Sequence, residues 1–177
     1  MKFIKLCILA IAFLYAQTAM ATKPFGLDIG NATLDDIKKS HKGKVTGVSR
    51  WTDGPIYTLD VEAIEFSGLL EALAIFNEDK LLIGLGLQFR KDRFDAINKM
   101  FAEDLELQTS NIPFVGDKYV AYKDNDITVE LRSPHMSFQM DVFYETSEMR
   151  ALYEAKKAAN KLREAEQDKQ SLLGSND

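Results

Sequence analysis

The sequence predicts a mixed α+β fold, in which two tandem units of one helix plus antiparallel strands form a sheet with helices on one face, followed by a long C-terminal helix. Three observations predict this fold. The stretch GLDIGNATLDDIKK, which begins at Gly26, has a counterpart, GLQFRKDRFDAINK, which begins at Gly86. Apolar residues alternate with polar ones over several segments, as strands require. From Glu145 onward Ala, Glu, Lys and Arg dominate, as in an exposed helix.

The two related stretches set the predicted boundaries. Their identical positions are Gly26/Gly86, Leu27/Leu87, Asp35/Asp95, Ile37/Ile97 and Lys39/Lys99. Because the same kind of element falls at the same place in both halves, we expect a duplicated unit. The predicted organisation is a signal segment at 1–21, a domain at 22–144 with repeats at about 24–89 and 90–144, and a helix with a frayed end at 145–177.

The first unit is expected to begin with a short helix. Thr33 has the residue type of an N-cap, and Asp36 follows at the spacing of a capping box. Gly43 is the expected stop. Asp53-Gly54 then predicts a hairpin turn, after which alternation puts Tyr57, Leu59 and Val61 on one face.

A second hairpin is expected to turn at Asn77–Asp79. Its second arm places one set of apolar residues on one face, namely Leu81, Ile83, Leu85, Leu87 and Phe89. Leu82, Gly84, Gly86 and Gln88 fall on the other face. Glycines within a strand predict that another part of the molecule packs closely against them.

The second unit is expected to restart at Lys91-Asp92 with an amphipathic helix, whose apolar residues are Phe94, Ile97, Phe101 and Leu105. A turn at Asp124–Asp126 then joins two strands. Alternation places the following side chains inward: Ile127, Val129, Leu131, Met136, Phe138, Met140, Val142 and Tyr144.

The first residues are typical of a cleavable secretory signal. Lys2 and Lys5 accompany an apolar run shorter than a membrane span, and small residues precede an expected cleavage after Ala21. The competing interpretation is an uncleaved anchor. We therefore expect a periplasmic or secreted protein of a Gram-negative envelope. Cys7, the only cysteine, lies in the signal, so no disulfide is expected.

Composition and motifs argue against several function classes. The chain has 22 basic and 27 acidic residues, a net charge of −5, which disfavours nucleic acid and anionic membranes as main partners. No phosphate-binding loop, dinucleotide fingerprint or nucleophile elbow occurs. His41 and His135 are interpreted as surface or turn residues. DNDITVE, from Asp124, is interpreted as a polar turn rather than a calcium loop. We expect no enzyme activity, cofactor or metal.

Two features suggest binding to another protein. Trp51 and Tyr57 lie beside a hairpin turn, and these residue types are favoured at interfaces; the alternative is that Trp51 closes the core. The C-terminal helix carries Met149, Leu152 and Tyr153, which could dock a partner or a second copy. The alternative is that these apolar residues lie back on the sheet.

The order PFGLDIGNATLDDIKK, strands, then ALAIFNEDKLLIGL resembles small exported bacterial domains. These are the outer-membrane assembly lipoproteins of the SmpA/OmlA type and the tandem-repeat β-lactamase inhibitory proteins. Gly30, Thr33 and Ile37 carry most of the resemblance, which spans Pro24 to about Phe89. The chain departs from it in having no acylated cysteine, so no stable membrane anchor is implied, and in carrying Arg90 where Gly30 would map. The resemblance implies a protein-binding scaffold of the bacterial envelope.

The leading hypothesis is therefore a non-enzymatic envelope protein that binds another envelope protein through the polar sheet face or the C-terminal helix, with Trp51, Tyr57, Met149, Leu152 and Tyr153 exposed. A homo-oligomer through that helix is a further expectation. One alternative is a small apolar ligand in a cavity lined by Met136, Phe138, Met140 and Phe101. Another is a hydrolase that uses His135 or a carboxylate.

Overall fold

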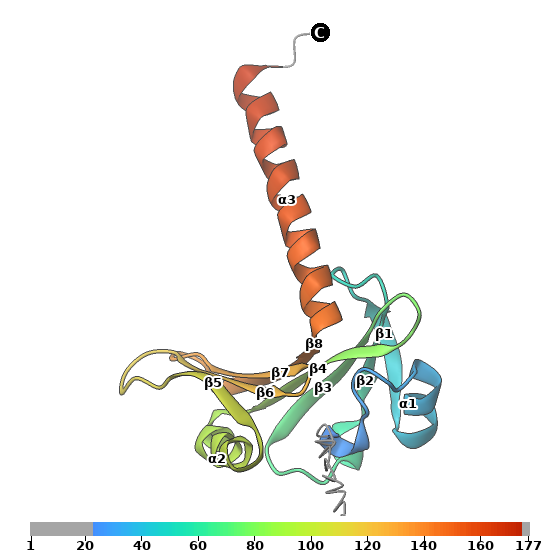
Figure 1. Cartoon of the computed structure of the whole chain (residues 1–177), viewed down its shortest axis with the longest axis vertical. Helices are drawn as coiled ribbons and strands as arrows, with labels where there is room; N and C mark the ends of the chain where they lie inside the picture. Colours follow the sequence, from blue (N-terminus) through green and yellow to red (C-terminus); the bar gives the residue numbers. More distant parts are fainter. Residues whose placement is uncertain (1–22, 175–177) are drawn as a thin grey trace, which may run out of the picture.

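The computed structural model describes residues 23–174 as one eight-stranded antiparallel sheet with three α-helices (Figure 1). The predicted signal segment at 1–21 lies outside the described residues. Within the described part, no helix combines the length and hydrophobicity needed to cross a bilayer. The mixed α+β class predicted from the sequence is confirmed.

The elements follow in this order: α1 (Leu34–Ser40), β1 (Gly43–Val48), β2 (Pro55–Leu59), β3 (Leu69–Phe76), β4 (Leu82–Arg90), α2 (Phe94–Asp104), β5 (Glu106–Asn111), β6 (Lys118–Asp124), β7 (Ile127–Ser133), β8 (Gln139–Thr146) and α3 (Ser147–Leu173). Short 3₁₀ turns precede both α1 and α2. The strand order across the sheet is β1-β2-β3-β4-β8-β7-β6-β5. Strands β4 and β8 pair at the centre, in register from Gly84↔Glu145 to Arg90↔Gln139.

Local sequence signals explain the first elements. Thr33 and Asp36 form the predicted capping box, in which the Asp36 amide donates to the Thr33 hydroxyl at 3.3 Å and the Thr33 amide donates to Asp36 at 3.0 Å. The three predicted turns are also present. Asp53 and Asn125 have positive φ within two of them, and Lys80 has positive φ directly after the one predicted at Asn77–Asp79.

The hydrophobic core lies between one face of the sheet and helices α1 and α2. Leu34 and Ile37 of α1 and Phe94 and Ile97 of α2 are buried in it. The sheet supplies Tyr57, Leu59, Leu85, Leu87, Phe89, Ile127, Val129, Leu131, Met140, Val142 and Tyr144, all predicted to point inward. Helix α3 rises from the opposite side of the sheet (Figure 1).

Some predicted orientations are wrong. Met136 and Phe138 are 90% and 95% exposed, because the chain turns after Pro134 and β8 begins only at Gln139. They therefore cannot line an internal ligand cavity. Leu82, predicted on the polar face, lies in the core because a bulge at this point shifts the pairing of β3 with β4.

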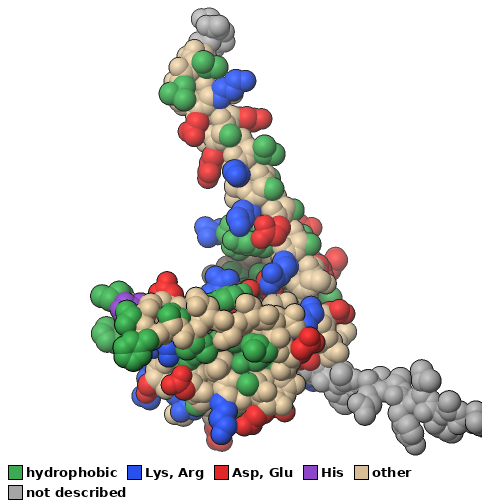
Figure 2. All heavy atoms as spheres, turned by 60° about the vertical axis from the view of Figure 1, so that its left-hand side comes forward, with side chains coloured by type: hydrophobic (Ala, Val, Ile, Leu, Met, Phe, Trp, Pro, Cys, Tyr) green, Lys and Arg blue, Asp and Glu red, His purple; other side chains and the backbone are tan. Residues whose placement is uncertain are grey.

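The exposed residues Met136 and Phe138 belong to an apolar tip, which we define as Phe114, Val115, Met136 and Phe138 on two loops at one end of the sheet. The His135 amide donates to Asp117 at 2.7 Å and joins the two loops. Figure 2 shows hydrophobic side chains gathered beside a histidine at this end. A cluster of exposed apolar side chains of this kind is typical of a contact surface.

Candidate functional site

The candidate site is a groove at the base of α3, on the sheet face opposite α1 and α2. The groove has a volume of about 460 Å³ and is bounded by the 49–54 loop, the first turns of α3 and the outer face of the central strands. Its lining includes Trp51, Ile75, Glu130, Arg132, Asp141, Phe143, Glu145, Met149, Arg150, Tyr153 and Glu154. Clefts of this volume are large enough for a small ligand or for side chains of a partner.

The loop that carries Trp51 is held by buried polar side chains. The Ser49 hydroxyl accepts hydrogen bonds from the amides of Trp51 and Thr52, both at 3.2 Å. The Thr52 hydroxyl donates to the Phe76 carbonyl at 2.6 Å, which ties the loop to the end of β3. Because Ser49 and Thr52 are buried, these bonds fix the loop and therefore the position of Trp51.

Two aromatic rings join the loop to α3. Trp51 and Tyr153 pack edge to face with ring centroids 4.8 Å apart. The Arg50 guanidinium lies 4.6 Å from the centre of the Trp51 ring. Both rings are half-buried, so each retains a surface that solvent or a partner can reach.

The first turns of α3 are anchored to the sheet. The Thr146 hydroxyl caps the helix by accepting from the Met149 amide at 3.2 Å. Met149 is buried against Gly84, where an added Cβ would lie 2.9 Å from the Met149 sulfur. The close packing predicted at this glycine is therefore confirmed. Asn77 donates to Glu148 at 2.8 Å, and Lys156 forms an ion pair with Asp53.

A network of charged side chains forms the floor of the groove. Arg150 of α3 forms ion pairs with both Glu130 of β7 and Glu145 of β8. Arg132 also pairs with Glu130, and Tyr119 donates to Glu130 at 2.9 Å. The Glu130 and Glu145 side chains are only 9% and 11% exposed, whereas both arginines remain half-exposed.

The environments of the two glutamates move their pKa values in opposite directions. Burial raises the pKa of Glu130, but hydrogen bonds from Arg132 and Tyr119 outweigh it, so the pKa is lowered overall. For Glu145, burial outweighs the attraction of Arg150, and the pKa is raised. The network thus holds Glu130 ionised and penalises the ionised form of Glu145.

These opposite shifts predict opposite pH trends. The pKa of Glu130 is lower in the folded protein than in the unfolded chain. Ionised Glu130 therefore stabilises the fold when the pH is above its pKa in the unfolded chain, and this stabilisation is lost as the pH falls through its pKa in the folded protein. We expect Glu130→Gln to lower the free energy of unfolding by about 1–2 kcal/mol at about pH 7, with a smaller loss at about pH 3.

Glu145→Gln is the matched variant. Because folding raises the pKa of Glu145, ionisation of Glu145 lowers the stability of the parent protein as the pH rises from the pKa of Glu145 in the unfolded chain to its pKa in the folded protein. This variant should therefore gain stability relative to the parent as the pH rises. Urea unfolding across the pH range measures both differences, and the same pH trend in both variants would contradict the assignment.

The structure brings together only some of the predicted site residues. Trp51 and Tyr153 are in contact, whereas Leu152, the preceding residue of α3, is half-buried and does not line the groove. The expected exposure is wrong for Met149, which is 4% exposed because the first turn of α3 packs it against Gly84. It is also wrong for Tyr57, which is 4% exposed on the core face, where its hydroxyl donates to the His41 carbonyl at 3.1 Å.

The sequence reasoning missed the charged network. Glu130 belongs to DNDITVE, which predicts a polar turn, although its position between the inward residues Val129 and Leu131 places it on the outer face. The composition predicts Glu145 in the C-terminal helix, but β8 extends to Thr146, so Glu145 pairs with Arg150 from a strand. His135, considered for hydrolysis, is exposed on the loop beside the apolar tip.

The chain matches no protein-family model, no curated protein and no solved structure. Within residues 23–174, no group of three or more His, Cys, Asp or Glu residues is placed to hold a metal ion. The groove, its aromatic pair and its charged floor therefore have to be interpreted from their own geometry.

Proposed function

We propose that this chain is a non-enzymatic, secreted or periplasmic protein-binding module of the bacterial envelope. Its binding surface would be α3 together with the groove at the base of that helix. Another envelope protein is the proposed partner. This agrees with what the resemblance to exported bacterial scaffold domains implies.

The observation that carries the proposal is the distal part of α3. Every residue from 161 to 174 is exposed, so this part of the helix is not packed on the sheet. Leu162, Leu172 and Leu173 are 68%, 85% and 70% exposed along it. An unpacked helix of this length is only marginally stable alone, and burying apolar residues against a partner would stabilise it.

We further infer that the domain consists of two tandem units, α1 with β1–β4 and α2 with β5–β8. The strand order supports this, since β1 to β4 lie in chain order from one sheet edge to the centre and β5 to β8 lie in chain order from the other edge to the centre. The edge strands β1 and β5 are both wholly exposed, and each has a bulge in its pairing, at Val45/Gly47 and Leu107/Thr109. Such bulges discourage edge-to-edge association. Helix α3 packs on β4 and β8 at the centre of the sheet.

The proposal is tested by crosslinking and capture from the periplasm, using the full chain and a version that ends at Asn160. The shorter version keeps Thr146, Met149, Tyr153 and Lys156, so the domain should unfold at an unchanged urea concentration. We expect capture of one partner to fall by about tenfold or more when the distal helix is removed. Equal capture by both versions would contradict the role of α3. Capture of a second copy of this chain would assign the distal part of α3 to self-association.

A further inference from the structure

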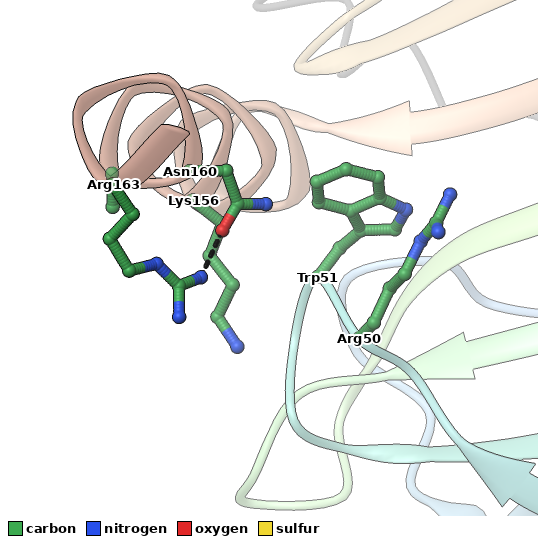
Figure 3. A pocket seen from close by; sticks show the side chains of 6 residues that line it. Arg50, Trp51, Lys156, Asn160 and Arg163 are labelled. Atoms are coloured by element: carbon green, nitrogen blue, oxygen red, sulfur yellow. Dashed lines mark hydrogen bonds between the residues drawn. The ribbon is translucent and has the colours of Figure 1, made fainter. Parts of the chain in front are cut away.

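A second hollow shares Trp51 with the groove. It has a volume of about 360 Å³, and we call it the notch. Its lining comes from Arg50 and Trp51 of the loop and from Lys156, Ala159, Asn160 and Arg163 of α3. Figure 3 shows Trp51 between the α3 side chains Lys156, Asn160 and Arg163 on one side and Arg50 on the other.

The notch is positively charged on an acidic protein. Lys156 is neutralised by its ion pair with Asp53. Arg50 and Arg163 have no carboxylate partner among residues 23–174; Arg50 lies over the Trp51 ring, and Arg163 donates to the Asn160 amide oxygen. The whole chain, in contrast, carries a net charge of −5. Two uncompensated guanidinium groups therefore create a local attraction for anions.

The chemistry of the lining favours a carboxylate on a peptide. Guanidinium groups hold carboxylates through paired, charge-assisted hydrogen bonds. Trp51 and Ala159 add an apolar wall, which a small inorganic anion would leave unused but an aliphatic side-chain stem or a neighbouring apolar residue would cover. The notch also adjoins the exposed distal part of α3, so a segment that runs along this helix would reach it.

We propose that the notch binds an acidic segment of the partner protein, with one carboxylate of the segment at Arg163, a second at Arg50 on the other side of Trp51, and apolar atoms of the segment against Trp51. This inference rests on the proposed function, since it names the chemistry of the partner that α3 and its base would receive.

Trp51 provides a direct readout because it is the only tryptophan in the chain. The full chain is titrated with an octaglutamate peptide while tryptophan emission is recorded, and calorimetry supplies a second measurement. We expect a saturable emission change that weakens as salt is added. The double variant Arg50→Gln/Arg163→Gln should bind at least about tenfold more weakly.

The matched control is Lys38→Gln/Arg90→Gln, which removes the same amount of charge from residues outside the notch. It should bind octaglutamate as the parent does. Equal losses in both double variants, or no emission change with octaglutamate, would overturn the proposal. Tighter binding of tripolyphosphate than of octaglutamate would also overturn it, and would reassign the notch to a phosphate anion.

The peptide titration tests the notch, and the periplasmic capture tests the proposed function, so a negative result in one does not decide the other. Octaglutamate binding uses no partner, so its failure while α3-dependent capture persists would remove the acidic-segment assignment and leave the proposed function standing. Capture that does not depend on α3 would contradict the proposed function, whatever the notch binds.

Discussion

Replacing Gly54 with alanine is expected to lower the free energy of unfolding by about 3 kcal/mol. An added Cβ would lie 2.1 Å from the Phe76 carbonyl oxygen and 2.3 Å from that of Asn77. These are backbone atoms, and the turn that contains them is held in place because Asn77 accepts from the Leu81 amide at 2.9 Å and donates to Glu148. The loop that carries Trp51 would have to move away instead.

Gly47→Ala is the matched control for this prediction. No atom lies within 4 Å of a Cβ added there, so the change should stay within about 0.5 kcal/mol. Urea unfolding measures both variants. Similar losses of stability in the two would show that Gly54 does not pack against the turn between β3 and β4.

Tyr57→Ala is expected to lower the free energy of unfolding by about 3–5 kcal/mol, because the ring is buried in the core. Tyr57→Phe should cost only about 1 kcal/mol, for the hydrogen bond to the His41 carbonyl. Trp51→Ala should cost less than Tyr57→Ala, since Trp51 is only half-buried and packs against one ring of α3.

Urea unfolding of the three variants, together with partner capture, separates a core residue from a binding residue. A stable Tyr57→Ala protein that fails to capture a partner would show that Tyr57 contributes to binding rather than to the core. A Trp51→Ala protein that unfolds as readily as Tyr57→Ala would place Trp51 in the core instead.

The sequence predicts the elements that depend on local signals. Thr33 and Asp36 form a capping box from residues three apart, and the turns at Asp53, Lys80 and Asn125 need only their own neighbours. Alternation failed after Pro134, where the chain turns and leaves Met136 and Phe138 in solvent. The alternation of apolar residues in the sequence continues across this turn although the strand does not, so the pattern alone predicts a strand that begins too early.

The candidate site could be predicted only in part, because its charges meet through tertiary structure. Glu130, Glu145 and Arg150 come from β7, β8 and α3, and no spacing in the sequence relates them. Trp51 and Tyr153 are indicated by their residue types, and Gly84 adds a second signal, since a glycine on the outer face predicts close packing there. The partner of that glycine, Met149, follows only from the direction in which α3 leaves β8.

The central claim is that α3 and its base contact a partner protein. Its most direct test places a photo-crosslinking phenylalanine derivative at Leu162 on α3, at Phe114 on the apolar tip, or at Met100 on α2, all of which are exposed. After irradiation of the periplasm, the account predicts an adduct with one envelope protein from position 162 and none from position 100. Adducts from position 100 or 114 in the absence of any from position 162 would contradict it.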